Sequence, residues 1–260
     1  ADRARLDRWA NAAMPVAVAY LLAGSGALVS VTAGWSWPAG GRAAVAHLLG
    51  AGGLALAILA VGCRLYPRFL VATPPRYLPR LVLGTGAVGP AALAMGVGGA
   101  SRLLWIGAVL EATAITGFAA LYALTFRRSD RRRIGLYGPL AGSALALAGA
   151  LLELWMVLSP TGYRYLGAHR RLMLIGFLGT TIAGTAFQFY PPAVGTLPRG
   201  LASDRTAAVA LGALSLGVAL EALGIGRSAG PLVTLGGLLA TAGGLLVAVL
   251  VWATLRERDT

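Results

Sequence analysis

Two histidines occur in this chain of 260 residues, and each lies near the start of an apolar segment. The segment that begins at His47 runs on to Tyr66-Pro67, and the longer segment that begins at His169 runs on to Tyr190-Pro191-Pro192. Imidazole is the commonest metal ligand among protein side chains. The placement of the two histidines therefore indicates a metal ion, or a prosthetic group that contains one, held among apolar helices.

The elements that carry these histidines are those of an integral membrane protein. Hydrophobic residues make up 57% of the chain and charged residues 12%, whereas soluble domains have about 25% charged residues. The 37 glycines suit close packing of helices in lipid. The single cysteine, Cys63, excludes an internal disulfide, a cysteine-ligated iron–sulfur cluster and the two-cysteine attachment of a c-type haem.

Eight segments are apolar over about 20 residues, the length that a helix needs to cross a bilayer. We therefore predict an all-α integral membrane protein with eight transmembrane helices, the first of them retained and not removed as a signal peptide. The predicted segments are 12–33, 43–63, 80–99, 103–126, 136–158, 168–190, 206–225 and 231–254.

Arginine supplies all 22 basic residues, and most of them lie at segment ends that face one side of the membrane. The densest group is the block from Arg127 to Arg133. Because positive charge accumulates on the cytoplasmic side, the pattern predicts a prokaryotic cytoplasmic membrane protein with both termini in the cytoplasm. Topology thus explains the net charge of +13, and the expected partner is the lipid bilayer and not nucleic acid.

The eight segments divide into two sets of four with weak internal similarity. The residues that correspond at nearly constant spacing are His47 and His169, Tyr66 and Tyr190, and Arg102 and Arg227. We therefore predict two parallel four-helix repeats, 1–134 and 135–260, related by an axis along the membrane normal. The tyrosine–proline pairs are predicted to end their helices at the inner face.

Parallel repeats would place His47 and His169 at the same depth near the outer face, with their imidazoles facing each other. Two neutral imidazoles suit the two faces of a low-spin haem, whereas zinc needs about four ligands. We predict one non-covalent, bis-His haem b. Met173 and Gly176 share a helix face with His169, and small residues there would leave room for the ring. The predicted partners of the haem propionates are Arg42, Arg170 and Arg171. The alternative is that each histidine is only a hydrogen-bonding residue at the interface.

A longer stretch around His169 resembles a known helix. Ala168-His169-Arg170-Arg171-Leu172-Met173, then Ile182-Ala183-Gly184 and Pro191-Pro192-Ala193-Val194-Gly195, resemble the second transmembrane helix of haem-copper oxidase catalytic subunits. The resemblance implies that His169 is an axial ligand of a low-spin haem, and internal symmetry extends the role to His47. The chain has no histidines for the copper or the high-spin haem of that family, so it is not expected to reduce oxygen on its own.

Three acidic residues interrupt apolar segments: Glu111, Glu153 and Glu221. Carboxylates inside a membrane are costly and are therefore candidates for function. All three are predicted in the outer half of their helices, the half that also holds both histidines. They are candidates for proton transfer or for a quinone site near the haem, with Glu111 the deepest. The alternative is structural pairing with arginines at the outer side.

These observations favour a membrane-bound b-type cytochrome of a respiratory chain. It would transfer electrons between the quinone pool and a redox partner on the outer side, or serve as the membrane anchor subunit of a redox complex. It would thus be an electron-transfer subunit more than a complete enzyme. Two alternatives stay open: a haem-based sensor or handling protein for nitric oxide or oxygen, and a haem-free small transporter that uses Glu111 for coupling.

Overall fold

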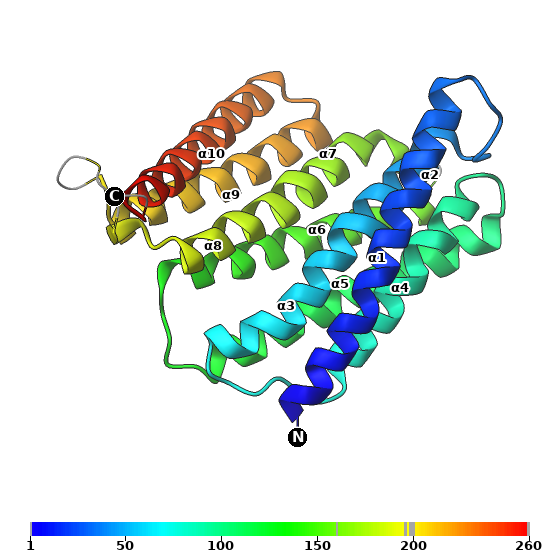
Figure 1. Cartoon of the computed structure of the whole chain (residues 1–260). Helices are drawn as coiled ribbons and strands as arrows, with labels where there is room; N and C mark the ends of the chain where they lie inside the picture. The colour runs from blue at the N-terminus through cyan, green and yellow to red at the C-terminus, as the bar shows by residue number, and fades with distance from the viewer. Residues whose placement is uncertain (1, 160, 195–196, 198–200, 259–260) are drawn as a thin grey trace. The chain divides into compact units, whose positions relative to one another are not determined.

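Helices supply the regular structure in the computed structural model, which describes residues 2–159, 161–194, 197 and 201–258 (Figure 1). Within this part of the chain, eight helices are long and apolar enough to cross a membrane, as the sequence predicts. Their bounds are Ala4–Thr32, Gly41–Phe69, Leu78–Gly96, Ser101–Arg127, Ile134–Leu158, Gly162–Phe189, Asp204–Arg227 and Gly230–Arg256. The orientation of the termini stays a prediction.

The helical elements follow one another with short connections. In chain order they are α1 (Asp2–Thr32), α2 (Gly41–Ala46), η1 (His47–Ala55), α3 (Leu56–Phe69), α4 (Leu78–Gly96), α5 (Ser101–Arg127), η2 (Ile134–Leu136), α6 (Tyr137–Leu158), η3 (Gly162–Tyr165), α7 (Leu166–Arg170), η4 (Arg171–Gly179), α8 (Thr180–Phe189), η5 (Pro192–Val194), α9 (Asp204–Arg227) and α10 (Gly230–Arg258).

Both spans that carry a histidine contain a wide, π-helical stretch. The stretch η1 begins at its histidine, and η4 begins two residues after its histidine. In a π-helix each amide bonds to the carbonyl five residues back instead of four. At the ends of the two stretches, the Leu56 amide bonds to the Ala51 carbonyl and the Thr180 amide to the Ile175 carbonyl. Such turns are frequent at functional sites.

The predicted helix stop at Tyr66-Pro67 differs from the structure, where α3 continues through Pro67 to Phe69. Tyr66 is buried, and its ring packs edge-on against the ring of Tyr122 with 4.9 Å between centroids. This aromatic packing holds the last turn in place although proline lacks an amide hydrogen. In the second half, α8 ends at Phe189, directly before the predicted stop.

The chain forms two compact units. Unit 1 comprises Ala1–Ser129 and Glu153–Pro160, and unit 2 comprises Asp130–Leu152 and Thr161–Thr260. The helix α6 thus contributes its first part to unit 2 and its end to unit 1. The predicted repeats, 1–134 and 135–260, assign the whole of α6 to the second half, and their internal similarity stays a prediction.

In unit 1 a tyrosine ties α1 to two other helices. The ring of Tyr20 lies against Gly52 of η1, where an added Cβ would come within 2.6 Å of the ring atom Cδ1. The Tyr20 hydroxyl donates to the Ala87 carbonyl of α4 at 2.6 Å and accepts from the Ala91 amide at 3.2 Å. It thereby bridges two backbone groups on either side of Pro90, the proline inside α4. A phenylalanine would fill the same space without this bridge.

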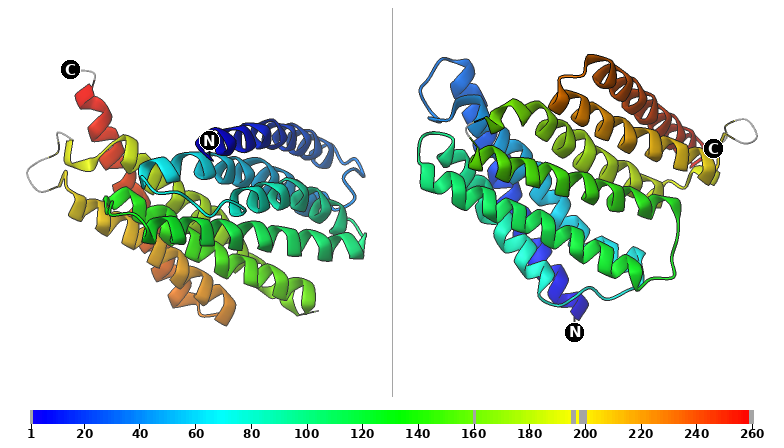
Figure 2. Two further views of the ribbon diagram at one scale, coloured as in Figure 1. Left: turned by 90° about the horizontal axis from the view of Figure 1, so that it is seen from below. Right: turned by 180° about the vertical axis from the view of Figure 1, so that it is seen from behind.

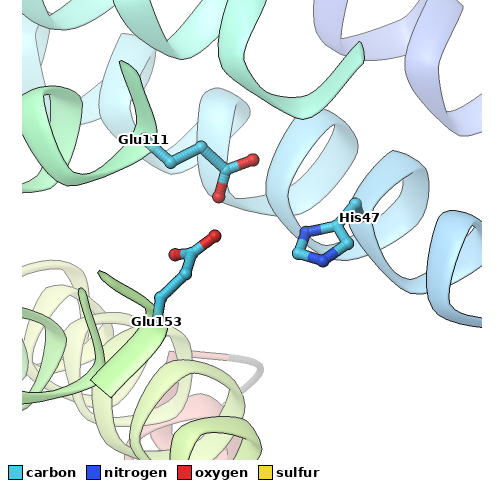
Figure 3. A group of neighbouring side chains, drawn as sticks. All are labelled: His47, Glu111 and Glu153. Atoms are coloured by element: carbon cyan, nitrogen blue, oxygen red, sulfur yellow. The ribbon is translucent and has the colours of Figure 1, made fainter. Parts of the chain in front are cut away.

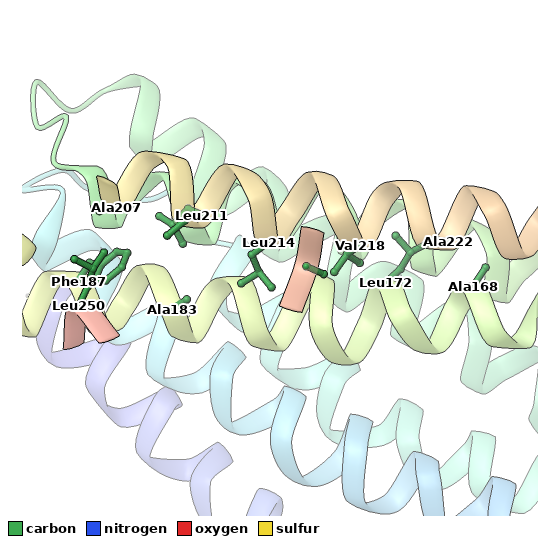
Figure 4. Close-up of a cluster of buried hydrophobic side chains, with 12 residues drawn as sticks. Ala168, Leu172, Ala183, Phe187, Ala207, Leu211, Leu214, Val218, Ala222 and Leu250 are labelled. Carbon is green, nitrogen blue, oxygen red and sulfur yellow. The ribbon is translucent and has the colours of Figure 1, made fainter. Parts of the chain in front are cut away.

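Unit 2 has its core where the sixth span meets α9. Small and medium apolar side chains from both helices interdigitate there, with α10 adding Leu250 (Figure 4). Alanines are frequent in the core, and small residues let helix backbones approach closely. The buried residues are Ala168, Leu172, Ala183, Phe187, Ala207, Ala210, Leu211, Leu214, Val218, Ala222, Ala240 and Leu250.

Glycines line the contact between α9 and α10, which run side by side (Figure 2). A Cβ on Gly217 would lie 2.7 Å from the Gly236 carbonyl oxygen, and one on Gly243 would lie 2.7 Å from the Ala210 carbonyl oxygen. Because these neighbours are backbone atoms, only glycine permits the observed separation of the two helices. The high glycine content of the sequence is thus used for helix packing.

Candidate functional site

Three of the predicted site residues come together in unit 1: His47, Glu111 and Glu153. Each offers one ligand atom, and these atoms lie within 4.8 Å of one another. Figure 3 shows the two carboxyl groups pointing toward each other, with the imidazole ring beside them. We refer to these three residues as the His–Glu–Glu cluster.

Three different helices position the cluster. His47 is the first residue of η1, Glu111 lies in α5, and Glu153 lies near the end of α6. The stem of Glu111 is held by close packing of α4 on α5, because a Cβ on Gly89 would lie 2.8 Å from Glu111 Cγ and 3.1 Å from its amide nitrogen. The cluster is therefore fixed by helix packing and not by a loop.

Both carboxyl groups of the cluster are buried. Glu111 is 7% exposed and Glu153 is 3% exposed. Among the described residues, one oxygen of each, Oε1, has no hydrogen-bond partner. Two negative charges side by side in an apolar environment are strongly unfavourable unless positive charge compensates them. The two buried carboxyl groups are therefore suited to binding a cation, either a proton or a metal ion.

The third intramembrane acid, Glu221, has a different environment in unit 2. Its buried carboxylate forms an ion pair with Arg171, with 3.1 Å between Glu221 Oε1 and Arg171 Nε. This is the structural pairing that the sequence left open as the alternative for these acids. Arg171 therefore already has an acidic partner. Arg42, Arg170 and Arg171 are all exposed. A role of the three arginines at haem propionates stays a prediction.

His169 is held by a backbone group of unit 2. Its Nδ1 lies 3.0 Å from the Gly149 carbonyl oxygen. Because a carbonyl oxygen only accepts, Nδ1 carries a hydrogen, and in the neutral ring Nε2 then carries the lone pair. Metal-binding histidines commonly have this arrangement, in which an outer hydrogen bond fixes the ring and leaves the other nitrogen for the metal.

The helix face below His169 packs against α6. A Cβ on Gly149 would lie 2.7 Å from Met173 Sδ, and a Cβ on Gly176 would lie 3.0 Å from Leu145 Cβ. Met173 and Gly176 thus take part in helix packing within unit 2, and the space beside Gly176 is filled by a leucine. Direct contact of these two residues with a haem stays a prediction.

His47 belongs to unit 1 and His169 to unit 2, and their predicted role as ligands of one iron stays a prediction. Sequence reasoning placed all three cluster residues in the outer halves of their helices but did not group them. Their shared depth was the signal that could have done so.

The final residue of the haem-helix resemblance, Gly195, lies outside the described residues. Comparisons of the chain with protein-family models, with curated proteins and with solved structures found no match.

Proposed function

We propose that this protein is a membrane-bound b-type cytochrome in which His169 is an axial ligand of one non-covalent haem b. The observation that carries the proposal is the hydrogen bond from His169 Nδ1 to the Gly149 carbonyl. It selects the tautomer whose Nε2 can bind iron and orients the ring. The donor nitrogen therefore fits the cofactor, and the resemblance of this helix to the low-spin haem helix of haem-copper oxidases points the same way.

The haem would supply one-electron redox chemistry, and the side chains around His169 would hold it in place. Gly149 fixes the imidazole through its carbonyl, and packing of Met173 on Gly149 keeps the two helices together. The electrons would pass between membrane quinone and a redox partner on the outer side, or through a complex for which this chain is the membrane anchor. The same proposal places the protein in a prokaryotic cytoplasmic membrane with both termini inside.

The second axial ligand predicted from the sequence is His47. Its neighbours in unit 1 are the carboxyl groups of Glu111 and Glu153. Together with the imidazole these groups suit a small cation, and a carboxylate could also accept a hydrogen bond from a histidine that binds haem iron. The proposal therefore rests on His169, and variants of His47 decide whether that residue completes the haem.

A reduced-minus-oxidised absorption spectrum of the purified chain tests the proposal. We expect the sharp bands of low-spin haem in the parent protein and their loss in His169→Ala. Tyr163→Phe, which changes an exposed tyrosine of the same span, should keep them. A purified protein without haem, or an unchanged spectrum in His169→Ala, would contradict the proposal.

Carbon monoxide separates electron transfer from gas sensing. A firmly six-coordinate haem in the reduced protein should hardly respond to carbon monoxide, because both axial positions are filled. A rapid shift of the spectrum would instead indicate an open iron position and favour the sensor for nitric oxide or oxygen.

The His–Glu–Glu cluster favours a second candidate, a haem-free transporter coupled to a cation. Carboxylates inside a membrane protein commonly mark ion or proton pathways, and Glu111 and Glu153 each have an oxygen without a hydrogen-bond partner among the described residues. Cation uptake into proteoliposomes tests this candidate. Uptake that Glu111→Gln abolishes and His169→Ala leaves unchanged would favour the transporter over the cytochrome.

A further inference from the structure

We propose that the His–Glu–Glu cluster of unit 1 is a binding site for one divalent first-row transition metal ion, separate from any haem at His169. The proposal goes beyond the cytochrome function and does not depend on it. It assigns His47, Glu111 and Glu153 as the three protein ligands, one from each of three helices.

The geometry is that of a site close to assembly. The three ligand atoms lie within 4.8 Å of one another, and around a tetrahedral ion with bonds of about 2.0–2.2 Å ligand atoms lie roughly 3.4 Å apart. Figure 3 shows the two carboxyl groups turned toward each other beside the imidazole, so rotation about the glutamate side-chain bonds is the movement that would close this difference.

The charge of the cluster also favours a divalent cation. Two ionised carboxylates and a neutral imidazole carry two negative charges, which a divalent ion balances. Glu221 shows how the chain neutralises a buried acid with its own residues, since Arg171 forms an ion pair with it. Glu111 and Glu153 each retain an oxygen without a hydrogen-bond partner among the described residues. These buried oxygens are therefore available as ligands.

The donor types select the class of metal. Magnesium and calcium take oxygen ligands, so an imidazole argues against both. Imidazole together with carboxylate suits zinc, iron and manganese. Three protein ligands leave a fourth position of a tetrahedral ion open to water or to a substrate, as in catalytic zinc sites. The cluster would therefore bind a metal that keeps one exchangeable position.

Zinc binding to the full chain in detergent tests the proposal. After removal of metals with a chelator, we expect one Zn²⁺ per chain by calorimetric titration. Glu111→Gln and Glu153→Gln keep the side-chain volume and remove an anionic ligand. Each should weaken Zn²⁺ binding by more than about tenfold. Loss of a residue that only hydrogen-bonds to a metal ligand already weakens metal affinity by about 10- to 100-fold, and loss of a ligand should cost at least as much.

Glu221→Gln is the matched control, because it changes a buried carboxylate that lies in unit 2 and not in the cluster. It should bind Zn²⁺ like the parent. X-ray absorption at the zinc edge should show one imidazole ligand, and His47→Gln should lose that signal while His169→Ala keeps it. These readouts can be taken whether or not the purified protein holds haem.

Three results would overturn the proposal. The first is a parent protein that binds no stoichiometric Zn²⁺. The second is unchanged affinity in both Glu111→Gln and Glu153→Gln, which would make the bound zinc adventitious. The third is a His47→Gln variant that loses the low-spin haem spectrum and still binds Zn²⁺, because His47 would then serve the haem. The haem spectrum of Glu111→Gln reports on the cytochrome separately, so the two proposals fail independently.

Discussion

Neighbouring glycines of α10 allow a direct test of how α9 and α10 pack. An alanine Cβ at Gly243 would lie 2.7 Å from the Ala210 carbonyl oxygen and closer still to the Leu214 amide nitrogen. An alanine Cβ at Gly244 would meet nothing within 4 Å. The two substitutions add the same methyl group to adjacent positions of one helix, and they differ only in what that methyl group meets.

The expected difference follows from this geometry. Both variants gain the same intrinsic helix stability, about 1 kcal/mol in a soluble helix. Only Gly243→Ala must push two backbones apart, and overpacking of this kind costs about 1–3 kcal/mol. The propensity gain cancels in the comparison. The free energy of unfolding of Gly243→Ala should therefore lie about 1–3 kcal/mol below that of Gly244→Ala, or about 5- to 150-fold in the equilibrium constant.

The assay is reversible unfolding of the full chain in mixed micelles, followed by circular dichroism as denaturing detergent is added. The adjacent pair Gly236 and Gly237 provides a second comparison, because a Cβ on Gly236 would lie 2.7 Å from the Gly217 carbonyl oxygen while one on Gly237 would meet its nearest atom at 3.9 Å. Equal stability of the two variants in both pairs would refute the packing argument.

Three further predictions concern polar contacts and the site. Tyr20→Phe removes the hydroxyl that bridges two backbone groups of α4 and should lower the free energy of unfolding by about 1–3 kcal/mol, measured in the same micelles. Arg171→Gln leaves the buried Glu221 carboxylate without its cationic partner; we expect a loss of about 1–2 kcal/mol, reduced from the buried-pair value because the arginine is half exposed. Gly89→Ala would press on the stem of Glu111 and should weaken Zn²⁺ binding along with stability, as titration would show.

Each of these variants has a matched control in the same half of the chain. Tyr77→Phe changes an exposed tyrosine, Arg170→Gln an exposed arginine, and Gly84→Ala a glycine of α4 with nothing within 4 Å of its added Cβ. The two exposed side-chain substitutions should change stability by less than about 0.5 kcal/mol. Gly84→Ala gains the same intrinsic helix stability as Gly89→Ala, so that this gain cancels in their comparison. A control that lost as much stability as its partner variant would show that the named contact is not the cause.

The eight spans could be predicted from the sequence, because a helix that crosses a bilayer must be apolar and about 20 residues long. They could not predict which polar side chains meet, because that depends on the rotation of each helix about its axis. Glu221 and Arg171 form a pair that the sequence offered only as one alternative. His47 was expected opposite another histidine, and within unit 1 its neighbours are Glu111 and Glu153. An apolar pattern around the whole circumference of a helix gives no signal for such rotation.

Backbone features were also beyond prediction from composition. The Tyr20 hydroxyl reaches two backbone groups in a helix far along the chain, and nothing in the local sequence distinguishes Tyr20 from an interfacial tyrosine. The helix α3 continues through Pro67, and Tyr66, the residue before this proline, packs against Tyr122 of α5. The sequence marks Pro67 and Pro191 as residues that can end a helix, but only the helix before Pro191 ends there.

The π-helical stretches η1 and η4 change which residues of these two spans share a helix face. A turn closed over five residues instead of four holds one additional residue, so side chains before and after the stretch are rotated relative to an ordinary helical wheel. A deletion of one residue within η1 would let the helix tighten to an ordinary α-helical turn, and the residues on either side would keep nearly the directions they have now. The same deletion in the α-helical part of the span would turn one end by about 100° relative to the other. The wide stretches are therefore the places where these spans would best tolerate the loss of a single residue.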